Sequence, residues 1–220
     1  MSAQPRTARG TRTRARLLAA AEDVFASAGY HDASIVRITE QAGIGLGTFY
    51  LYFGGKQEIF DEVVDDLNAR VRRAMTEAAR TAEDRFDAER EGFRAFFRFT
   101  AQHPALYRII RQAEFVSPGA QRRHYERIVR SYAHGLAAAQ DAGEVRALDP
   151  EIAAWALMGM GELIGMRYIL WEAGGVGEAD GAPRDIPDHV LDELMALIQR
   201  GLAPDAPPPA APPREDVRHD

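Results

Sequence analysis

Apolar residues near the start of the chain recur with the spacing of short amphipathic helices. From Leu17 to Ala28 they repeat at intervals of three, four and seven residues, and Gly29 follows as a residue that can end a helix in the left-handed conformation. A second apolar stretch begins after Ser34, whose hydroxyl can accept a hydrogen bond from a free backbone amide, and ends at Gly43. This pattern predicts two helices joined by a short turn.

A second turn and a third short helix are predicted to follow. Two glycines flank one apolar residue at positions 43–45, which favours a turn with that residue buried in its middle. The segment from Leu46 to Tyr52 is then expected to be helical, with Phe49 and Phe53 pointing inward. A helix, a glycine turn and another helix are the parts of a helix-turn-helix motif.

From residue 56 onward the apolar pattern predicts a helical body with few breaks. Its first helix is expected to link the N-terminal part to the rest and to transmit movement between them. A loop rich in glycine, aspartate and proline is expected at 174–187, and 203–220 holds half of the prolines and is predicted to be disordered. The predicted body helices cover residues 56–81, 83–103, 105–114, 118–142, 151–172 and 188–202.

These elements predict an all-α fold. An N-terminal three-helix helix-turn-helix domain is expected at 11–55, and a C-terminal helical domain at 56–202. A basic arm at 1–16 would precede them, and the proline-rich tail at 203–220 would follow.

The arm has a composition suited to nucleic acid. It contains no acidic residue and can contact the phosphate backbone or the minor groove of a duplex in a salt-sensitive way, although a solvated tail would have the same composition. Its arginines are Arg6, Arg9, Arg12, Arg14 and Arg16.

Residues 42–56 place small, aromatic and basic side chains at fixed spacing. With the segment from Phe25 to Tyr30 and with Ser34 and Ile38 upstream, they resemble the DNA-binding domain of the TetR family of transcriptional repressors. The resemblance covers a little over a quarter of the chain, and beyond it extends only to the family's helical layout. The matching positions are Ala42, Gly43, Ile44, Gly47, Thr48, Tyr50, Tyr52, Phe53 and Lys56.

The resemblance implies a homodimeric repressor that binds double-stranded, near-palindromic operator DNA with two heads in successive major grooves. A small-molecule effector among the body helices would bias helix 56–81, change the distance between the heads and release the operator. Activation in place of repression is compatible with the same residues. The rival interpretation is a helical module that binds a lipid-like ligand without DNA.

Several of the matched residues suit contact with a duplex. The small side chains of Gly47 and Thr48 let a helix approach base edges closely, and the hydroxyls of Tyr50 and Tyr52 can bond phosphate oxygens. Lys56 is the only lysine and begins a helix, where free amides favour a phosphate, and the resemblance gives it the same contact. The expected DNA-binding residues are Arg12, Arg14, Arg37, Leu46, Gly47, Thr48, Tyr50, Leu51, Tyr52 and Lys56.

Two positions depart from the family pattern. Gly45 stands where a serine is common, so one polar contact is missing and the turn is expected to be looser. Leu46 stands where a polar or basic residue often contacts a base, and its side chain can either meet a thymine methyl group or pack on the domain. These changes either weaken DNA binding or retune it.

Charge and composition separate the two regions and exclude some chemistry. Residues 1–53 hold six arginines and four acidic residues, so with a net charge of -6 for the whole chain the remainder carries -8, which would keep DNA at the basic end. The absence of cysteine excludes disulfides and thiolate chemistry. The N-terminus lacks the apolar core of a signal peptide, and Glu162 and Arg167 interrupt the most apolar helix. A cytoplasmic protein without a membrane span is expected.

The body has enough aromatic and methionine side chains to line a cavity for a small apolar or amphipathic effector. An arginine mouth on such a cavity would suit an acyl chain with a carboxylate, coenzyme A thioester or phosphate head, whereas solvated surface arginines are the alternative. The expected lining is Phe93, Phe96, Phe97, Arg98, Tyr107, Arg108, Arg111, Phe115, Met158, Glu162 and Met166.

The last two helices are predicted to form the dimer interface. Helix 151–172 is apolar around most of its circumference and therefore needs cover on more than one side, either from a partner subunit in a four-helix arrangement or from a monomer core. The expected interface residues are Trp155, Gly161, Gly165, Ile169, Leu191, Leu194 and Ile198.

Enzymatic motifs are absent from the sequence. The six histidines show no paired metal-ligand spacing, and neither a nucleophile elbow nor a Walker loop appears. Neither a cofactor, a metal nor a catalytic residue is expected.

Overall fold

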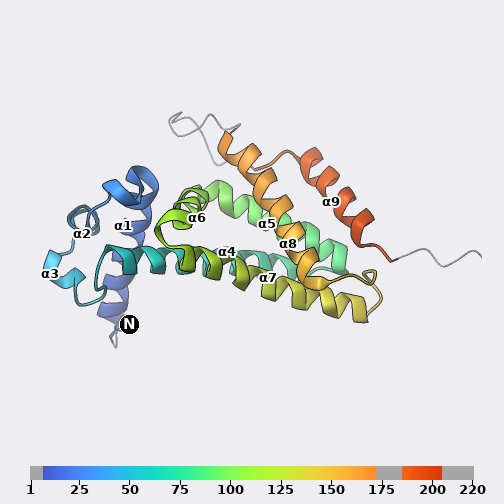
Figure 1. Cartoon of the computed structure of the whole chain (residues 1–220), viewed down its shortest axis with the longest axis horizontal. Coiled ribbons are helices and arrows are strands. Elements are labelled where there is room, and N and C mark those ends of the chain that lie inside the picture. Colours follow the sequence, from blue (N-terminus) through green and yellow to red (C-terminus); the bar gives the residue numbers. More distant parts are fainter. Residues whose placement is uncertain (1–6, 172–184, 205–220) are drawn as a thin grey trace, which may run out of the picture.

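The computed structural model describes residues 7–171 and 185–204, which form helices and no strand. The all-α fold class is confirmed. Three helices make up the N-terminal end, hereafter the head, and the remainder forms the body (Figure 1). The elements are α1 (Ala8–Asp32), α2 (Ile35–Ala42), α3 (Leu46–Phe49), α4 (Lys56–Ala79), α5 (Arg85–Gln102), α6 (Ala105–Val116), α7 (Pro118–Asp141), α8 (Pro150–Gly165), the π-helix η1 (Met166–Trp171) and α9 (Asp188–Leu202).

The ends of α2 follow directly from its sequence. Ser34 is its N-cap, and the Ser34 hydroxyl accepts a hydrogen bond from the Arg37 amide at 3.2 Å. Gly43 ends the helix in the left-handed conformation, with φ of +61°. Both predictions for this helix are confirmed.

Several element boundaries differ from the sequence prediction. The Thr7 hydroxyl caps α1, so residues 8–16 are helical and the predicted arm is confined to the few residues before them. Gly29 interrupts α1 at φ of +78° and ψ of 164°, and one further turn follows it. Within 151–172 the α-helix ends at Gly165 and continues as a π-helix. Most of 174–187 and 203–220, the predicted loop and tail, lies outside the described residues.

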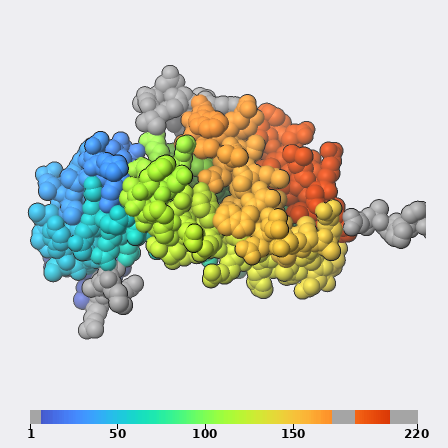
Figure 2. Space-filling view, viewed as in Figure 1, coloured from blue at the N-terminus to red at the C-terminus, as the bar shows by residue number. Residues whose placement is uncertain are grey.

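The head and the near half of the body share one hydrophobic core. Phe25 of α1 meets Phe60 of α4 edge to face, with ring centroids 5.1 Å apart, and Ile109 of α6 is fully buried in the same cluster. A second core joins α5, α7, α8 and α9. Figure 2 shows the head as one end of a continuous surface. The boundary predicted near residue 55 therefore separates two parts that are packed together.

Helix α4 runs lengthwise from the head into the body, with α7 beside it (Figure 1). Its apolar face, which includes Ile59, Val63 and Leu67, is buried along the first core. A rigid element that belongs to both parts can carry a displacement from one to the other. No helix within 7–171 or 185–204 has the length and apolar character needed to cross a membrane.

Candidate nucleic-acid interface and ligand cavity

The α2–turn–α3 segment presents an outward surface held in place by two buried rings. Phe49 and Phe53 are 0% and 1% exposed, whereas Tyr50 is 55% and Leu51 is 70% exposed. Leu46 is 46% exposed, so its side chain is not packed in the core of the head. The predicted inward positions of Phe49 and Phe53 are confirmed, whereas Tyr52 is half-buried against the same core, and α3 ends at Phe49 and not at Tyr52.

The glycines of this segment have open space around them. A Cβ added at Gly45 or at Gly47 would meet no atom within 4 Å. Neither glycine is therefore required by packing inside the protein. Without a side chain, Gly47 leaves the backbone of α3 open to close approach by a molecule outside the protein, as expected for a helix that lies against a duplex.

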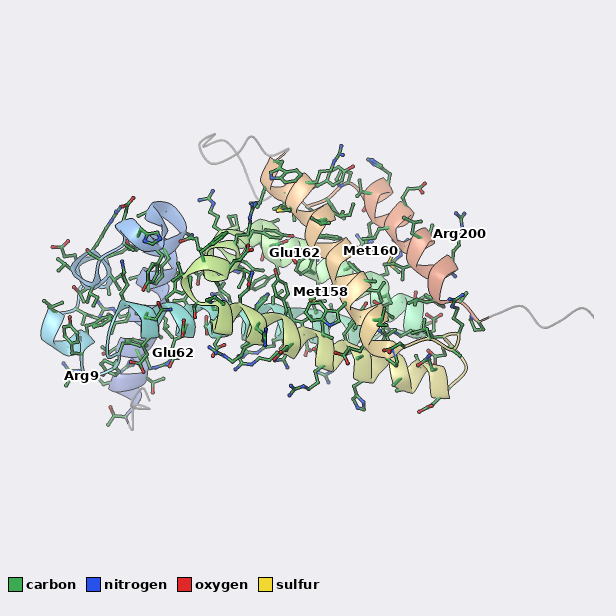
Figure 3. The ribbon with its side chains drawn as sticks, viewed as in Figure 1. Arg9, Glu62, Met158, Met160, Glu162 and Arg200 are labelled. Carbon is green, nitrogen blue, oxygen red and sulfur yellow. The ribbon has the colours of Figure 1, made fainter. Side chains whose placement is uncertain are left out.

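Arg14 and Arg16, two of the arginines expected to contact DNA, hold the head together. Arg14 forms an ion pair with Glu62 of α4 and lies 5.4 Å from the centroid of the Phe53 ring. Arg16 donates to the carbonyl oxygens of Ala42 and Gly43 at the end of α2. Arg12 and Arg9 are exposed, and Figure 3 shows Arg9 at the outer end of the head and Glu62 beside α1. In the free protein Arg14 is therefore held within the head, and the predicted DNA contact would require it to leave Glu62.

Lys56 also has an internal role. Its ammonium group donates to the carbonyl oxygens of Tyr30, His31 and Ala33 at 2.8, 3.3 and 2.9 Å, and it lies 4.4 Å from the centroid of the Tyr30 ring. An ammonium group has three N–H donors, so all are engaged. The last carbonyls of a helix lack intrahelical partners, which explains why a cation binds here. In the free protein Lys56 therefore caps the end of α1, and the predicted phosphate contact would require its ammonium group to leave these carbonyls.

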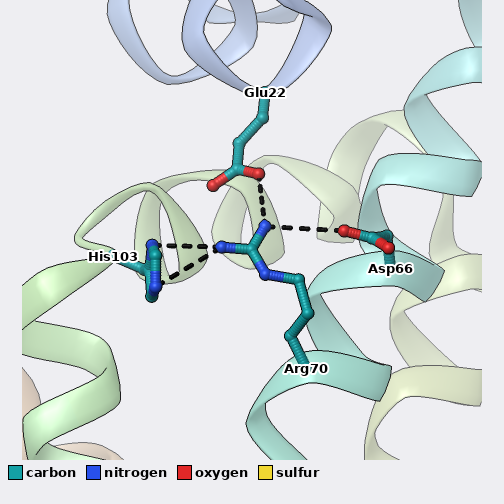
Figure 4. A network of polar contacts seen from close by, with 4 residues as sticks. All are labelled: Glu22, Asp66, Arg70 and His103. Carbon is teal, nitrogen blue, oxygen red and sulfur yellow. Dashed lines mark hydrogen bonds and ion pairs between the residues drawn. The ribbon is translucent and has the colours of Figure 1, made fainter. Parts of the chain in front are cut away.

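A cluster of charged side chains joins the head to the body (Figure 4). Arg70 of α4 donates to Glu22 of α1 at 2.7 Å, lies 3.5 Å from Asp66, and contacts the His103 ring nitrogen Nδ1 at 3.1 Å. Burial, and then the positive charge of Arg70, lower the pKa of His103, while Glu22 opposes them. Three elements, α1, α4 and the end of α5, are thus tied at one point.

Helix α6 holds the other side of α1. Gln112 accepts a hydrogen bond from the Tyr30 amide at 2.6 Å and donates to the Phe25 carbonyl at 3.3 Å. Arg108 donates to the Ala26 carbonyl at 3.3 Å. Arg108 was expected in the ligand cavity, and its contact with α1 corrects that prediction.

A cavity of about 650 Å³, including its open mouth, lies among α4, α5, α6, α7 and α8. Figure 3 shows Met158 and Glu162 on the side of α8 toward the middle of the body, with Met160 nearer to α9. Most lining side chains are aromatic or aliphatic. They are Met75, Phe93, Phe96, Leu106, Tyr107, Ile110, His124, Tyr125, Ile128, Tyr132, Leu157, Met158, Gly161 and Glu162.

Five of the predicted lining residues are in place, namely Phe93, Phe96, Tyr107, Met158 and Glu162. The other predictions are wrong because neighbouring residues on a helix face different directions. Phe97 is fully buried in the second core, and Phe115 is 83% exposed. Arg98 pairs with Asp185, while Arg111 reaches Met166 at the surface, and neither Arg111 nor Met166 lines the cavity.

Helix α7 contributes a cavity wall that sequence reasoning missed. His124, Tyr125, Ile128 and Tyr132 line the cavity from one face of this helix. Their spacing of three or four residues was the available signal. Glu126, Arg127 and Arg130 lie between them and hid this signal, because they give α7 the composition of a surface helix.

The polar groups of the cavity are few, and two of them, the buried hydroxyls of Tyr107 and Tyr132, have no hydrogen-bond partner. The Tyr125 hydroxyl donates to Glu162 Oε1 at 2.9 Å, and burial together with the Glu162 charge raises the pKa of Tyr125. The Asn68 amide of α4 donates to His124 Nδ1 at 3.1 Å and to the His124 carbonyl at 2.9 Å. Burial lowers the pKa of His124 to about 4, so this ring is neutral at pH 7.

The predicted dimer residues lie mostly inside the protomer. A Cβ at Gly161 would lie 2.8 Å from Phe93, and one at Gly165 would lie 2.1 Å from the Tyr107 hydroxyl. These glycines therefore let α5 and α6 approach α8 within one chain. Buried in the same way are Ile169, Leu191, Leu194 and Ile198, which corrects the prediction for all six.

A different set of apolar side chains faces solvent on the same helices. Trp155, the remaining predicted interface residue, is 43% exposed. Ile152 and Leu163 of α8 and Leu197 of α9 are each more than 60% exposed, and Met160 is 40% exposed. We call these five residues the α8/α9 face. Exposed apolar side chains of this size make the α8/α9 face a candidate interaction surface.

Comparison with known proteins finds relatives in sequence and in fold. Residues 17–63 match the model for bacterial regulatory proteins of the tetR family. A crystal structure of a TetR-family transcriptional regulator from Pectobacterium atrosepticum is 30% identical, covers 91% of this chain and 98% of that one, and has a TM-score of 0.64.

Curated relatives match over shorter stretches. The HTH-type transcriptional activator FasR of Mycolicibacterium smegmatis is 34% identical over 108 residues, which are 47% of this chain and 48% of that protein. The uncharacterized HTH-type transcriptional regulator YdgC of Bacillus subtilis is 43% identical over 70 residues, 32% of this chain and 35% of that protein. The match thus spans about half or less of these two relatives.

Proposed function

The chain belongs to the TetR family of bacterial regulatory proteins, and we propose that it is a homodimeric transcriptional regulator that binds operator DNA and responds to a small molecule. It acts in the cytoplasm, where its DNA is, and it has no catalytic step. The observation that carries this proposal is the outward surface of α3, where Tyr50 and Leu51 stand exposed over buried Phe49 and Phe53.

Helix α3 enters the major groove in this proposal. Gly47 lets its backbone come close to the bases, and Leu46 and Leu51 offer apolar contact to thymine methyl groups. The hydroxyls of Tyr50 and Tyr52 bond phosphates and fix the register. Further contacts come from Thr48, from Arg37 on α2, and from Arg9 and Arg12 on α1, all of which are at least partly exposed.

Two copies of the chain pair through the α8/α9 face. The pair presents two heads to a near-palindromic operator, in major grooves one helical turn apart, roughly 34 Å. Residues 11–55 bind DNA, and residues 56–202 bind the ligand and the second copy.

Helix α4 connects the ligand to the heads. Its Met75 lines the cavity, its Arg70 is bonded to Glu22 of α1, and its Phe60 lies in the core of the head. A ligand that favours one position of α4 therefore favours one separation of the two heads. The change in operator affinity is limited by how much more tightly the ligand binds one of these two conformations than the other. The relative FasR is named an activator, so whether this protein represses or activates transcription is measured separately, with a reporter gene.

The test is binding to duplex DNA selected from a random pool, followed by fluorescence anisotropy at several salt concentrations. Gly47→Leu fills space that is empty in the free protein, so it should leave the melting temperature unchanged and lower DNA affinity at least tenfold. Gly201→Leu adds the same side chain on α9, where space is also open, and should leave DNA affinity unchanged. If no duplex attaches in a salt-dependent way, the protein is a ligand-binding module without DNA.

A further inference from the structure

We propose that the cavity binds an organic cation with an apolar body, whose positive head lies between the Glu162 carboxylate and the tyrosine rings. The proposal concerns the class of ligand that the cavity binds. Only the effect of that ligand on DNA binding rests on the proposed function. It replaces the acyl carboxylate or thioester expected from the sequence.

The charges around the cavity carry this inference. Among its lining residues Glu162 is the only acid, and none is lysine or arginine. His124 is buried, and its ring nitrogen Nδ1 accepts a hydrogen bond from Asn68, so the ring is neutral and supplies no positive charge. An anionic head would enter a low-dielectric space beside a like charge, without a cation to pair with it.

Arginines near the cavity that are able to pair with an anionic head are engaged elsewhere. Arg98 pairs with Asp185, and Arg108 donates to the Ala26 carbonyl of α1. Arg85 stacks on the Tyr132 ring, 5.3 Å from its centroid, and is paired with Glu89. These arginines do not line the cavity.

The aromatic side chains favour a cation as well. Phe93, Phe96, Tyr107, Tyr125 and Tyr132 line the cavity, and the face of an aromatic ring attracts a cation, more strongly when water is excluded. The Tyr125 hydroxyl bonds to Glu162 and so holds the carboxylate in a fixed position.

The remaining lining suits an apolar body. Met75, Leu106, Ile128, Leu157 and Met158 supply aliphatic surface, and the flexible methionines adapt to different shapes.

The experiment compares three probes that share a ten-carbon chain: decyltrimethylammonium, decanol and decanoate. Binding to the full-length protein is measured by calorimetry without DNA. In a Trp171→Phe variant the remaining tryptophan, Trp155, has its ring centroid 6.1 Å from that of Tyr125, and its fluorescence reports binding independently. The cation is expected to bind at least tenfold more tightly than decanoate, a difference of about 1.4 kcal/mol. Equal or tighter binding of decanoate overturns the proposal, as does the absence of measurable cation binding.

A charge-removing variant isolates the role of the carboxylate. Glu162→Gln keeps the shape of the side chain and is expected to weaken decyltrimethylammonium tenfold while changing decanol less than twofold. Glu77→Gln makes the same change on the exposed surface of α4 and should alter neither. Unchanged cation binding by a folded Glu162→Gln protein contradicts the proposal. Because the comparison of the three probes needs only the natural protein, a variant that fails to fold leaves the proposal testable.

The outcomes also separate this inference from the proposed function. Cation binding without any DNA binding supports the proposed ligand class and contradicts the proposed function as a DNA-binding regulator. DNA binding without cation binding supports the regulator and contradicts the proposed ligand class. When both occur, anisotropy with and without saturating decyltrimethylammonium measures whether the two are coupled.

Discussion

Single residues in the head divide into those that hold it together and those that are free to meet DNA. Sequence patterns could assign Phe49, Phe53 and Leu51, because helical periodicity alone sets which side chains point inward. They could not assign Arg14 or Lys56, whose partners are distant along the chain. Glu62 is 48 positions from Arg14, and the Tyr30 carbonyl is 26 positions from Lys56.

Lys56 gives a prediction that separates an internal cap from a phosphate contact. Lys56→Met removes three hydrogen bonds to carbonyls that have few other partners, so we expect urea unfolding to show a loss of about 1–2 kcal/mol, with allowance for partial exposure. The slope of log affinity for DNA against log salt should stay the same, because no phosphate loses a cation.

Arg12→Gln is the matched control for the Lys56 variant. Its side chain is exposed at the start of α1, so the variant should keep its stability and reduce the salt slope by about 0.9, the value for one phosphate contact. A salt slope reduced in the Lys56 variant as well would mean that the lysine leaves its carbonyls to bind the backbone.

At the level of helices, sequence reasoning found the elements and most of their ends, because caps and breakers act locally. It missed the early end of α3, where the chain turns after Phe49, and the change to a π-helix after Gly165. It also misassigned Phe115 and Phe97 to the cavity. The neighbouring helices decide which face of an apolar helix points into a cavity. The sequence of a single helix does not show where those neighbours lie.

The contact between α4 and α7 gives a prediction for acid stability. The pKa of His124 is lowered to about 4, first by burial and then by Arg127, whereas an unfolded histidine has a pKa near 6.5. The folded state therefore binds fewer protons between these values. The contribution of neutral His124 to the free energy of unfolding is therefore fully present above about pH 6.5. It falls by roughly 3 kcal/mol as the pH drops toward 4.

Urea unfolding of the natural protein and of His124→Gln across pH 4–7.5 measures this effect. Glutamine keeps an acceptor for Asn68 but does not titrate, so the difference in free energy of unfolding between the two proteins should shrink toward low pH. His134→Gln, on the exposed side of α7, is the control. His103, whose pKa is also lowered, contributes in the same direction in all three proteins. A pH-independent difference would show that His124 does not titrate in this way.

At the level of the whole molecule, sequence and structure agree on two regions but differ on what joins them. The shared core around Phe25 and Phe60, and the Arg70 cluster with Glu22 and His103, make the head continuous with α4 and α6. In the proposed mechanism, such packing carries a displacement of α4 to the head without a hinge. A sequence shows where a helix is apolar, but not which of its apolar sides is buried within the chain and which side is exposed.

The α8/α9 face gives the last prediction. A negative charge introduced at Leu163, which is 61% exposed, should leave the protomer folded and prevent two copies from pairing, because the carboxylate would be buried against apolar side chains. Leu163→Glu is expected to be monomeric at micromolar concentration by light scattering after gel filtration. Its operator affinity should fall more than tenfold, since each head then binds alone and the gain from simultaneous contact is lost.

Phe115→Glu places the same charge at another exposed apolar position, on α6, and should remain a dimer. A dimeric Leu163→Glu protein, or a natural protein that is monomeric at this concentration, would assign the α8/α9 face to another partner.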